Sequence, residues 1–588
     1  MCGALRREHI GQEVTLFGWV ATTRNLGGMI FVDLRDRDGI VQVRFDPGTD
    51  VYDQAVALRS EWCVGVIGEV ISRGENANED KPTGAVEIKV KHLEVFNSAK
   101  TPPFLIREDT DANEPQRLRY RYMDLRREPL QRALIMRSQM NQATRNYLTD
   151  NGFLELETPI LTKSTPEGAR DYLVPSRVHP GKFFALPQSP QIFKQLFMIA
   201  GYDRYFQIVR CFRDEDLRAD RQPEFTQIDM EMSFVTQDDV FRISEGLISA
   251  IFERALGVTL QTPFPRMSYT EAMRRFGVDK PDLRYALELK DVSELAGATG
   301  FNVFSGTVAA GNPVRGLCVK GAADKYSRKG ITGLEETAKL FGAKGLAWAK
   351  VTADGWTGGI SKLIKEEEQA LFNKAMGAED GDLLLFVADR EDIVCAALGN
   401  LRNRLAKELE LIKEDSWNLC WVVDFPMFEY DHDEDRHHAM HHPFTSPKPE
   451  HADLMDTDPT AVLAQAYDLV LNGFEIGGGS IRIHDAQMQS KVFDLLGMSQ
   501  EEAREKFGFL LDALTYGTPP HGGLAFGMDR LAMLLSGATS LRDVIAFPKT
   551  ASASDLMCEA PSSVDDAQMK ELSLSSTAKP KSDESTKQ

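Results

Sequence analysis

The first hundred residues alternate between apolar and polar positions, a pattern that predicts short β-strands in a domain of residues 1–100. The expected strands cover residues 14–20, 30–35, 40–45, 63–71 and 85–95. The second and third flank Asp38-Gly39, a dipeptide typical of a tight hairpin turn. Five short strands suit a small Greek-key barrel of the OB type, although another small β-barrel would fit the same pattern.

A helical repeat comes after a stretch without clear periodicity. Residues 101–130 contain a Thr-Pro-Pro sequence and many arginines, so we interpret them as a hinge or linker. From about 130 to 150, apolar residues recur every three or four positions, which predicts a helix that ends at Asn151-Gly152. The alternation over 153–157 predicts a strand, which Pro159 ends.

The composition of the chain changes at two points further along the sequence. A mixed α/β block continues to about residue 278, and residues 279–412 are rich in glycine without a cluster of reactive side chains. Sequences typical of a functional site then resume. The simplest interpretation is one catalytic domain, 131–278 plus 413–558, interrupted by an inserted α/β domain at 279–412. Residues 559–588 contain almost no large apolar side chains, so we expect a disordered tail.

Composition narrows the class of protein. With 588 residues, 42% hydrophobic and 27% charged, the chain is long enough for several globular domains. No apolar run approaches the ~20 residues that span a bilayer, and the N-terminus lacks the apolar core of a secretory signal. Seven cysteines without a CxxC pair fit free thiols in a reducing compartment. We therefore expect a cytoplasmic protein with no membrane segment. The net charge of −20 still allows local basic patches that bind nucleic acid.

A charged hairpin holds the densest cluster of chemistry-bearing residues. Residues 204–212 and 224–231 read as two strands joined by a loop rich in arginine and acidic residues. Guanidinium groups match phosphate oxygens in pairs, and the ring of Phe225 offers a stacking face for a base. A salt-bridged hairpin on the surface would have the same composition, so this pattern alone leaves both interpretations open.

A second stretch, residues 522–535, reads as a strand, a glycine turn and an apolar helix that begins near Arg530. An arginine beside a helix N-terminus is well placed for an anionic group. Taken alone, the stretch could equally be a packed strand–helix turn. The chain contains no GxxxxGK[ST] phosphate loop, which weakens the alternative of an OB-fold domain joined to an unrelated ATPase.

Together, the helix–strand–proline unit at 130–159 and these two stretches resemble, in order, the three signature motifs of class II aminoacyl-tRNA synthetases. Further stretches resemble the aspartyl members of bacterial type, namely TPEGARDY (165–172), QSPQIFK (188–194), MHHPFT (440–445) and GGGSIR (477–482). The resemblance covers nearly all of the chain before residue 558. It implies an OB-fold anticodon-binding domain and an α+β catalytic domain built on an antiparallel sheet, with an inserted α/β domain.

The resemblance implies an aspartate–tRNA ligase activity: L-aspartate reacts with ATP to give aspartyl-adenylate and pyrophosphate, and aspartate is then esterified onto tRNA(Asp). The substrate carboxylate itself attacks the α-phosphate, so the site has to align the reactants and neutralise charge. By resemblance, Arg213 contacts the α-phosphate and the carboxylate, and Arg530 the γ-phosphate. Other residues expected to bind ATP are Asp214, Glu215, Gln222, Phe225, Glu475, Gly527, Met528 and Asp529.

Mg²⁺ is expected to accompany ATP, because this hard cation prefers carboxylate and phosphate oxygens. Asp468 and Glu475 are the ligands that the resemblance implies. We expect Asp468 on a helix, where an acidic residue more often lies on the surface. The histidine-rich stretch 432–442 has no regular ligand spacing, so a separate metal site there is the weaker interpretation.

Selection of aspartate over its neutral isostere asparagine requires fixed positive charge. The resemblance assigns Arg482 and Lys194 to the side-chain carboxylate. Ser480, Arg482 and His484 are expected to alternate onto one face of a strand. The remaining residues expected to contact aspartate are Glu167, Ser189, Gln191, Arg213, Asp229, His441 and His442.

The barrel is expected to read the tRNA anticodon. Phe31 could stack on a base, as aromatic residues do on OB surfaces, and its alternative is a place in the barrel core. Arg24, Gln42 and Glu87 match family positions that make polar contacts to anticodon bases. Leu26 is the residue type associated with members that charge only tRNA(Asp).

Four questions stay open at this stage. Asparaginyl- and lysyl-tRNA synthetases share the barrel and the motifs, but the long insertion and the pair Arg482 and Lys194 favour an acidic substrate. An inactive paralogue usually loses a motif arginine or a metal-binding acid, whereas Arg213, Glu475 and Arg530 are all present. The apolar helix at 130–150 predicts a homodimer, unless it packs only within its own subunit. The inserted domain either touches the acceptor arm of tRNA or merely extends the fold.

Overall fold

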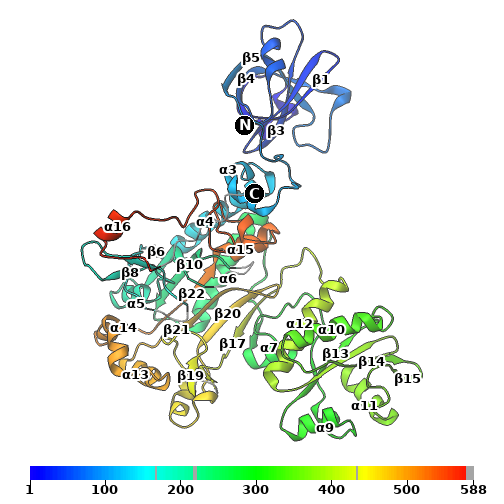
Figure 1. The fold of residues 1–588 in the computed structure, drawn as a ribbon, viewed down its shortest axis with the longest axis vertical. Helices are drawn as coiled ribbons and strands as arrows, with labels where there is room; N and C mark the ends of the chain where they lie inside the picture. Colours follow the sequence, from blue (N-terminus) through cyan, green and yellow to red (C-terminus); the bar gives the residue numbers. More distant parts are fainter. Residues whose placement is uncertain (166–168, 216–220, 432–434, 578–588) are drawn as a thin grey trace. The chain divides into compact units, whose positions relative to one another are not determined.

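The computed structural model describes residues 1–165, 169–215, 221–431 and 435–577 (Figure 1). The chain forms two compact units. One unit contains Met1–Ser138 and Ala532–Val564, together with the segment that ends at Gln222. The other unit contains the intervening chain, up to Leu531, and the C-terminal residues from Asp565. Among the described residues, no helix has both the length and the apolar character that crossing a membrane would require.

The N-terminal strands close into a five-stranded barrel in the order β1-β2-β3-β5-β4. The strands are β1 (Glu13–Leu26), β2 (Met29–Asp36), β3 (Gly39–Phe45), β4 (Cys63–Ser72) and β5 (Val86–Asn97). The predicted hairpin is confirmed: Asp36 pairs with Gly39, and its Oδ1 accepts hydrogen bonds from the backbone N–H groups of Asp38 and Gly39 at 2.9 and 3.2 Å. Alternate residues such as Val32 and Val43 fill the barrel, as the period of two requires.

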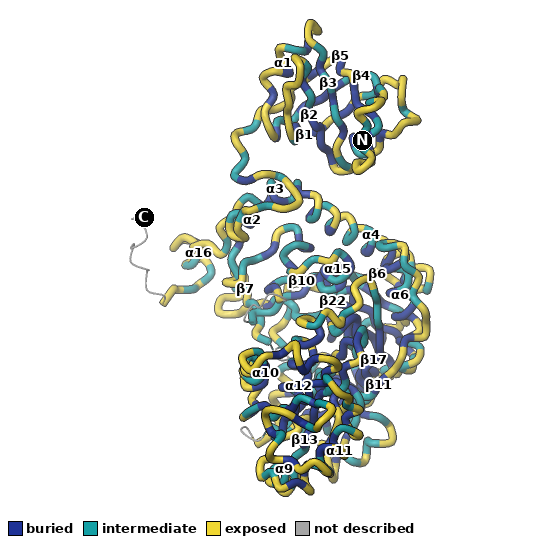
Figure 2. Tube along the Cα trace, turned by 90° about the vertical axis from the view of Figure 1, so that its right-hand side faces the viewer, coloured by how far each residue is buried: buried dark blue, intermediate teal, exposed yellow. Residues whose placement is uncertain are grey.

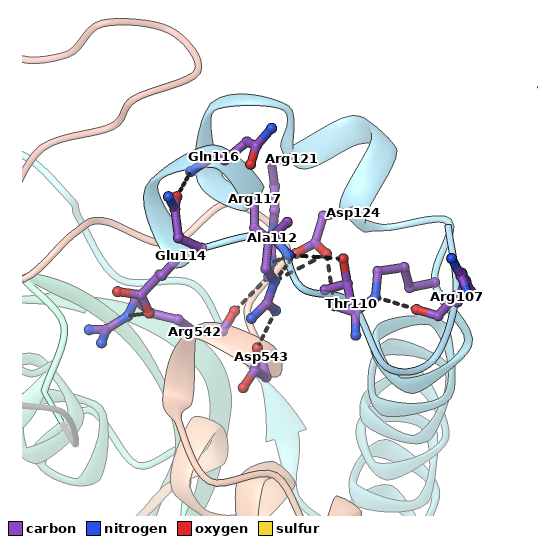
Figure 3. A network of polar contacts seen from close by, with 12 residues as sticks. Arg107, Thr110, Ala112, Glu114, Gln116, Arg117, Arg121, Asp124, Arg542 and Asp543 are labelled. Atoms are coloured by element: carbon purple, nitrogen blue, oxygen red, sulfur yellow. Dashed lines mark hydrogen bonds and ion pairs between the residues drawn. The ribbon is translucent and has the colours of Figure 1, made fainter. Parts of the chain in front are cut away.

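The stretch predicted as a linker is folded. It contains helices α2 (Glu114–Arg119) and α3 (Arg121–Asp124) and leads into α4 (Glu128–Asp150). The carboxylate of Asp124 is fully buried between three arginines (Figure 3). Its distances to Arg117 Nε, Arg121 NH1 and Arg127 NH1 are 3.1, 2.7 and 3.0 Å.

The same arginines hold the segment that follows α15 (Met528–Ser536) in the chain. Arg121 donates hydrogen bonds to the backbone carbonyls of Arg542, Ile545 and Ala546, and Arg117 pairs with Asp543 at 2.8 Å. Carbonyl and carboxylate oxygens thus satisfy guanidinium groups that are largely removed from water. The hinge region is therefore a packed and ion-paired element.

An eight-stranded sheet forms the centre of the second unit, in the order β11-β17-β20-β21-β22-β10-β9-β6. The strands are β6 (Leu154–Glu155), β9 (Arg204–Phe212), β10 (Glu224–Ser233), β11 (Arg266–Ser268), β17 (Leu419–Val423), β20 (Ala466–Leu471), β21 (Phe474–Ile481) and β22 (His521–Gly527). The pairs at the two edges are parallel and the inner pairs are antiparallel. The strands of this sheet are largely buried (Figure 2). The predicted antiparallel sheet is thereby confirmed.

Helices cover this sheet and connect its strands. They are α5 (Gln191–Ile199), α6 (Gln237–Leu256), α7 (Tyr269–Phe276), α13 (Ala486–Leu495) and α14 (Gln500–Leu514). Phe241 of α6 stacks on Trp421 of β17 with ring centroids 4.3 Å apart. The indole N–H of Trp421 donates to Glu245 at 2.9 Å, so even the buried polar group of this aromatic contact has a partner.

Residues between β11 and β17 form a separate sheet of five strands, in the order β12-β13-β16-β14-β15. The strands are β12 (Lys290–Asp291), β13 (Val314–Val319), β14 (Ala347–Thr352), β15 (Gly355–Thr357) and β16 (Leu383–Ala388). Helices α10 (Arg328–Leu340) and α12 (Glu391–Glu408) build one core against it. Helices α8 (Ser293–Gly297), α9 (Asn302–Ala309) and α11 (Glu366–Met376) build another (Figure 1). This α/β sandwich lies within the predicted insertion, whose limits at 279 and 412 stay a prediction.

Short elements complete the fold. They are α1 (Tyr52–Ala57), the hairpins β7 (Leu173–Pro175) with β8 (Phe183–Ala185) and β18 (Phe428–Asp431) with β19 (Arg436–Ala439), and α16 (Asp566–Glu571). The last of these helices lies in the stretch predicted to be a disordered tail. Oε1 of Glu571 in this helix lies 3.8 Å from Nε of Arg177.

Candidate active site

A polar cavity of about 390 Å³ lies where β20, β21, β22 and β10 run side by side. The sheet order explains its composition, because strands far apart in the sequence become neighbours. Most of the predicted aspartate-binding residues line it, namely Ser189, Gln191, Lys194, Arg213, Asp229, His441, His442 and Arg482. The predicted metal ligands Asp468 and Glu475 line the same cavity. Glu167 lies outside the described residues.

The floor of this cavity is a buried network of alternating charges. Lys194 Nζ lies 2.9 Å from Asp229 Oδ1 and 3.1 Å from Glu231 Oε2. Arg482 pairs with Glu231 through two contacts, Nε to Oε1 at 2.9 Å and NH2 to Oε2 at 3.1 Å. None of these four side chains is more than 2% exposed. Two cations and two carboxylates are thus paired with one another at positions almost fully removed from the protein surface.

Glu231 is the residue of this network that sequence reasoning did not identify. Burial opposes its ionisation, but the charges of Arg482 and Lys194 lower its pKa to about 2. Gly523 on β22 faces it, and a Cβ atom there would collide with the Glu231 carboxylate. The two-residue alternation along β10, with Asp229 and Glu231 on one face, is the sequence signal that could have identified Glu231.

Two further contacts fix the position of the NH1 nitrogen of Arg482. Its NH1 donates to Ser480 Oγ at 2.7 Å and lies 2.6 Å from Nε2 of His442. Burial and the charge of Arg482 hold the pKa of His442 well below its usual value. The ring is therefore neutral near pH 7, and its Nε2 can accept a hydrogen bond that the NH1 group of Arg482 donates.

His441 also lines the cavity, and burial lowers its pKa to about 4. Its ring lies edge-on to Phe425, with centroids 4.7 Å apart. Ser480, Arg482 and His484 are expected to alternate onto one strand face, but only Ser480 lies in β21, and Arg482 forms an isolated bridge with Thr445 just beyond it; both of these side chains are buried. His484 is exposed, because β21 ends at Ile481.

The structure corrects the local setting of Asp468, which lies on strand β20 and not on a helix. Burial and the nearby charges of Glu475 and Asp279 raise its pKa well above the usual value. A Cβ atom at Gly478 on β21 would collide with Asp468 Oδ1, so this glycine leaves room for the carboxylate. Carboxylate oxygens that repel one another in one cavity fit a divalent cation. Within the described ranges, no group of three or more His, Cys, Asp or Glu side chains could by itself hold a metal ion.

The signature motifs contact one another around the hairpin of β9 and β10. Arg213 lies over the ring of Phe225, 5.1 Å from its centroid. Arg530 NH1 donates to the backbone carbonyl of Glu475 at 2.8 Å. The carboxylate of Asp529 accepts the backbone N–H of Thr226 at 2.7 Å, so it ties α15 to β10.

Four further residues predicted to bind ATP have a described position. Asp214 and Glu215 follow β9, and the backbone N–H of Asp214 donates to the carbonyl of Arg170 at 3.0 Å. Gly527 ends β22 and Met528 begins α15. The role of all four in ATP binding stays a prediction.

Gln222 belongs to the N-terminal unit. Its side-chain amide bonds both backbone groups of Lys549, donating to the carbonyl at 3.1 Å and accepting the N–H at 2.8 Å. Gln222 as a residue is 5% exposed, and its amide makes a structural contact with Lys549. Its predicted role in ATP binding stays a prediction.

The four residues predicted to read the anticodon lie on one face of the barrel. Arg24 pairs with Asp33 at 2.8 Å and donates to Gln42 Oε1 at 3.2 Å, and Gln42 Nε2 donates to Glu87 at 2.6 Å. Phe31 pairs with Arg24 across β1 and β2 and is half-buried, between the buried residues Ile30 and Val32. Its ring therefore lies on the outer side of the barrel wall and not in the core.

Comparison with known proteins gives these two regions a family. Residues 113–551 match the model of tRNA synthetases class II (D, K and N), and residues 14–96 match the OB-fold nucleic acid binding domain. The aspartate–tRNA ligase of Macrococcus caseolyticus is 57% identical over 97% of both chains. The aspartate–tRNA(Asp/Asn) ligase of Bacillus mycoides is also 57% identical, over 97% of this chain and 98% of that protein.

Solved structures share the fold at low sequence identity. Asparaginyl-tRNA synthetase from Pyrococcus horikoshii, complexed with asparaginyl-adenylate, aligns with a TM-score of 0.60 at 21% identity, over 93% of this chain and 97% of that one. An aspartyl-tRNA synthetase from Entamoeba histolytica aligns with a TM-score of 0.56 at 18% identity, over 92% and 89%. The fold and the close relatives agree, and the chain belongs to the aspartate–tRNA ligase family of class II tRNA synthetases.

Proposed function

We propose that this protein activates L-aspartate with ATP to aspartyl-adenylate and then transfers aspartate to the 3′ end of tRNA(Asp). The buried contacts of Arg482 and Lys194 are the observation that carries the proposal. These two cations lie in a cavity that also contains Asp229, a counter-charge for the ammonium group of an amino acid. A zwitterion with an additional carboxylate complements this set of charges.

The same geometry accounts for rejection of asparagine. Nζ of Lys194 and the guanidinium of Arg482 are donors only, and the neutral His442 accepts from Arg482. A substrate carboxylate accepts from these donors with both oxygens. The side-chain NH₂ group of asparagine is itself a hydrogen-bond donor, so it could not accept a hydrogen bond from Lys194 or Arg482. A buried polar group left without a partner costs binding free energy.

The ATP end of the cavity supplies positive charge and a cation site. We assign Arg213 to the α-phosphate, Arg530 to the γ-phosphate and Phe225 to the adenine ring. Asp468 and Glu475 would hold Mg²⁺, which supplies neutralisation of phosphate charge when bound. The protein contributes orientation of the reactants and needs no nucleophile of its own.

The barrel is proposed to bind the anticodon. Phe31 offers a half-exposed ring, and Arg24, Gln42 and Glu87 form a hydrogen-bonded row beside it. A row of donors and acceptors next to a stacking ring suits the edges of unpaired bases. Arg24, bonded to Asp33 and Gln42, is held in one orientation before RNA arrives.

We further propose a cytoplasmic homodimer. Leu154, Ile160 and Leu161 are 46%, 41% and 51% exposed along the segment that follows α4. Neighbouring exposed apolar side chains of this kind favour coverage by a partner. Sedimentation of the wild type as a dimer, and of Leu161→Asp as a monomer, would support this assignment. A monomeric wild type would contradict it.

The function is tested by aminoacylation of purified tRNA(Asp) and tRNA(Asn) with labelled aspartate, with Mg²⁺ and with excess chelator. Charging of tRNA(Asp) that requires Mg²⁺ is the expected result. Comparable charging of tRNA(Asn) would broaden the tRNA specificity, in line with the name of the Bacillus relative. Failure to charge either tRNA would contradict the proposal.

A further inference from the structure

The chain enters the predicted insertion through a short segment that lies beside the polar cavity. Helix α7 is capped by Gly277, where φ is +69°, and Asp279 follows two residues later. Asp279 lines the polar cavity together with Asp468 and Glu475. It is not among the residues that the family resemblance implies. The root of the inserted domain thus brings a further carboxylate to the cavity.

Two glycines let this segment pack directly against the inserted domain, where helices α7 and α12 lie side by side (Figure 1). A Cβ atom at Gly277 would lie 2.5 Å from the carbonyl oxygen of Cys395 on α12. A Cβ atom at Gly399 would lie 2.8 Å from the carbonyl oxygen of Gly277. Only glycine permits so close an approach of two backbones. Helix α12 therefore helps to set the position of Asp279.

Arg402 on α12 anchors the next residues of the segment. Its guanidinium donates hydrogen bonds to the backbone carbonyls of Asp282 and Leu287, both at 2.6 Å, and to that of Tyr285 at 3.1 Å. The guanidinium carbon also lies 4.1 Å from the centroid of the Tyr285 ring. Arg402 is fully buried, so its charge depends on these acceptors and holds them in place.

The same segment contacts the hairpin that carries the proposed cation ligands. A Cβ atom at Gly473, in the turn between β20 and β21, would lie 3.0 Å from the Cβ atom of Asp282. Strands β20 and β21 carry Asp468 and Glu475. The segment that contains Asp279 is thus held between helix α12 of the inserted domain and a hairpin of the catalytic sheet.

The carboxylates on this hairpin lie close to each other and to the charge of Asp279. A Cβ atom at Gly478 would lie 2.3 Å from Asp468 Oδ1 and 3.7 Å from Glu475 Oε1, so both groups converge on the space above this glycine. Burial raises the pKa of Asp468, the charges of Glu475 and Asp279 raise it further, and the charge of Lys280 lowers it. Lys280 Nζ lies 4.0 Å from Asp279 Oδ1, so this ion pair is loose. A divalent cation would relieve the repulsion.

Mg²⁺ retains several of its water molecules when one or two carboxylates and phosphate oxygens bind it. No three described His, Cys, Asp or Glu side chains could together hold a metal ion, so Asp279 is not a third direct ligand here. We propose that Asp279 is a positioning residue of the activation site, which accepts hydrogen bonds from cation-bound water and so orients the cation between Asp468 and Glu475. This inference rests on the proposed function, because it concerns the cation that accompanies ATP.

Binding of Mn²⁺ to the full-length protein, followed by the electron paramagnetic resonance signal of free Mn²⁺, tests the proposal without turnover. Asp279→Asn should raise the dissociation constant about tenfold or more, the typical effect of losing an acceptor just outside the direct ligands of a metal. Asp279→Glu keeps the carboxylate and should retain most of the affinity. In ATP–pyrophosphate exchange, Asp279→Asn should require more Mg²⁺ for half-maximal rate, and excess Mg²⁺ should restore the rate.

Asp291→Asn is the matched control. Asp291 also lies in the inserted domain, is 50% exposed compared with 43% for Asp279, and pairs loosely with Arg315 at 3.7 Å. It is not among the described residues that line the polar cavity, so its replacement should leave Mn²⁺ affinity unchanged.

Lys280→Gln supplies a change of opposite sign. Loss of this positive charge should tighten Mn²⁺ binding, because Lys280 opposes the negative potential at Asp468. A general disturbance of the segment would weaken binding in both Asp279→Asn and Lys280→Gln, and that result would contradict the electrostatic role.

Arg402→Lys tests whether the inserted domain places Asp279. Lysine keeps the charge but lacks the guanidinium fork that reaches three carbonyls at once. Hydrogen exchange in residues 279–287 should become faster and Mn²⁺ affinity should fall. Faster exchange with unchanged affinity would show that α12 does not place this carboxylate.

Two results would overturn the role of Asp279 itself. Unchanged Mn²⁺ affinity in Asp279→Asn would separate the residue from the cation, and a higher KM for aspartate in the same variant would then assign it to the amino acid. Absence of Mn²⁺ binding by the wild type would remove the cation site. Absence of exchange by a wild type that binds Mn²⁺ would contradict the proposed function, so the two failures are distinguishable.

Discussion

Arg482 and Glu231 form a two-point ion pair, with Nε–Oε1 and NH2–Oε2 distances of 2.9 and 3.1 Å, in which neither side chain is more than 2% exposed. Glu231 also contacts Lys194 at 3.1 Å, so one carboxylate orients both cations proposed to recognise aspartate. Orientation of the cations before the substrate binds reduces the reorganisation that binding requires.

Replacing Glu231 should therefore impair aspartate recognition even though this residue need not touch the substrate. In Glu231→Gln, the two cations lose a negative partner, and a loss of about 2–5 kcal/mol is typical for a buried charge pair. We expect a large rise in KM for aspartate with KM for ATP nearly unchanged, measured by pyrophosphate exchange. Equal effects on both KM values would instead indicate a general loss of structure.

Acidification should destabilise the unit that contains the eight-stranded sheet, through protonation of His441. The folded pKa of His441 is about 4, whereas histidine in the unfolded chain titrates near 6.5, so the unfolded state binds the additional proton between these values. The free energy of unfolding should fall as pH decreases from about 6.5 toward 4, and this group should have no effect above that range. Melting temperatures between pH 5 and 7.5 should depend less on pH in His441→Gln, and identical slopes would contradict the assignment.

The hinge cluster predicts a strong effect of Asp124→Asn on stability. This change leaves Arg117, Arg121 and Arg127 without their shared buried carboxylate, and removal of one partner from such a cluster costs about 3–5 kcal/mol. Hydrogen exchange should become faster in α2, α3 and residues 542–546.

Glu114→Gln is the control for this experiment. The Glu114 side chain pairs with Arg542 at 2.6 Å but is 46% exposed, so its loss should cost at most about 1 kcal/mol. Similar exchange rates in the two variants would refute the central role of Asp124.

The barrel face predicts a loss of tRNA binding without a loss of amino-acid activation. Phe31→Ala should weaken the affinity for tRNA(Asp) by about 1–3 kcal/mol, the typical value of one base stack. Pyrophosphate exchange should stay unchanged, because the residues proposed for adenylate formation that line the polar cavity belong to the other unit. Phe17→Ala is the control, since Phe17 is 60% exposed and pairs with Phe96 on the barrel. Equal weakening by both variants would argue against a specific role of Phe31.

The sequence predicted the elements whose periodicity is strong and local. The Asp38-Gly39 hairpin, the helix now seen as α4 and the strand–helix unit of β22 and α15 all occur as expected. The family resemblance also identified most residues of the polar cavity. Local pattern failed at Asp468, because Ala466-Tyr467-Asp468 has no feature that separates a helix from an inner strand.

Features that depend on tertiary neighbours could not be predicted from the sequence. The stretch around Asp124 looked like a linker because its arginines find their partners more than four hundred residues away. The alternation along β10 could have placed Glu231 on the same face as Asp229, but its contact with Arg482 arises only because β10 and β21 lie on either side of β22.

The most direct test of the central claim is ATP–pyrophosphate exchange with aspartate, asparagine and lysine side by side, in the wild type and in Arg482→Gln. The account predicts exchange with aspartate alone in the wild type, and loss of that exchange in the variant. Exchange with asparagine or lysine at a comparable rate would contradict selection by the Arg482 and Lys194 pair. Unchanged aspartate exchange in the variant would contradict the assigned position of the substrate carboxylate.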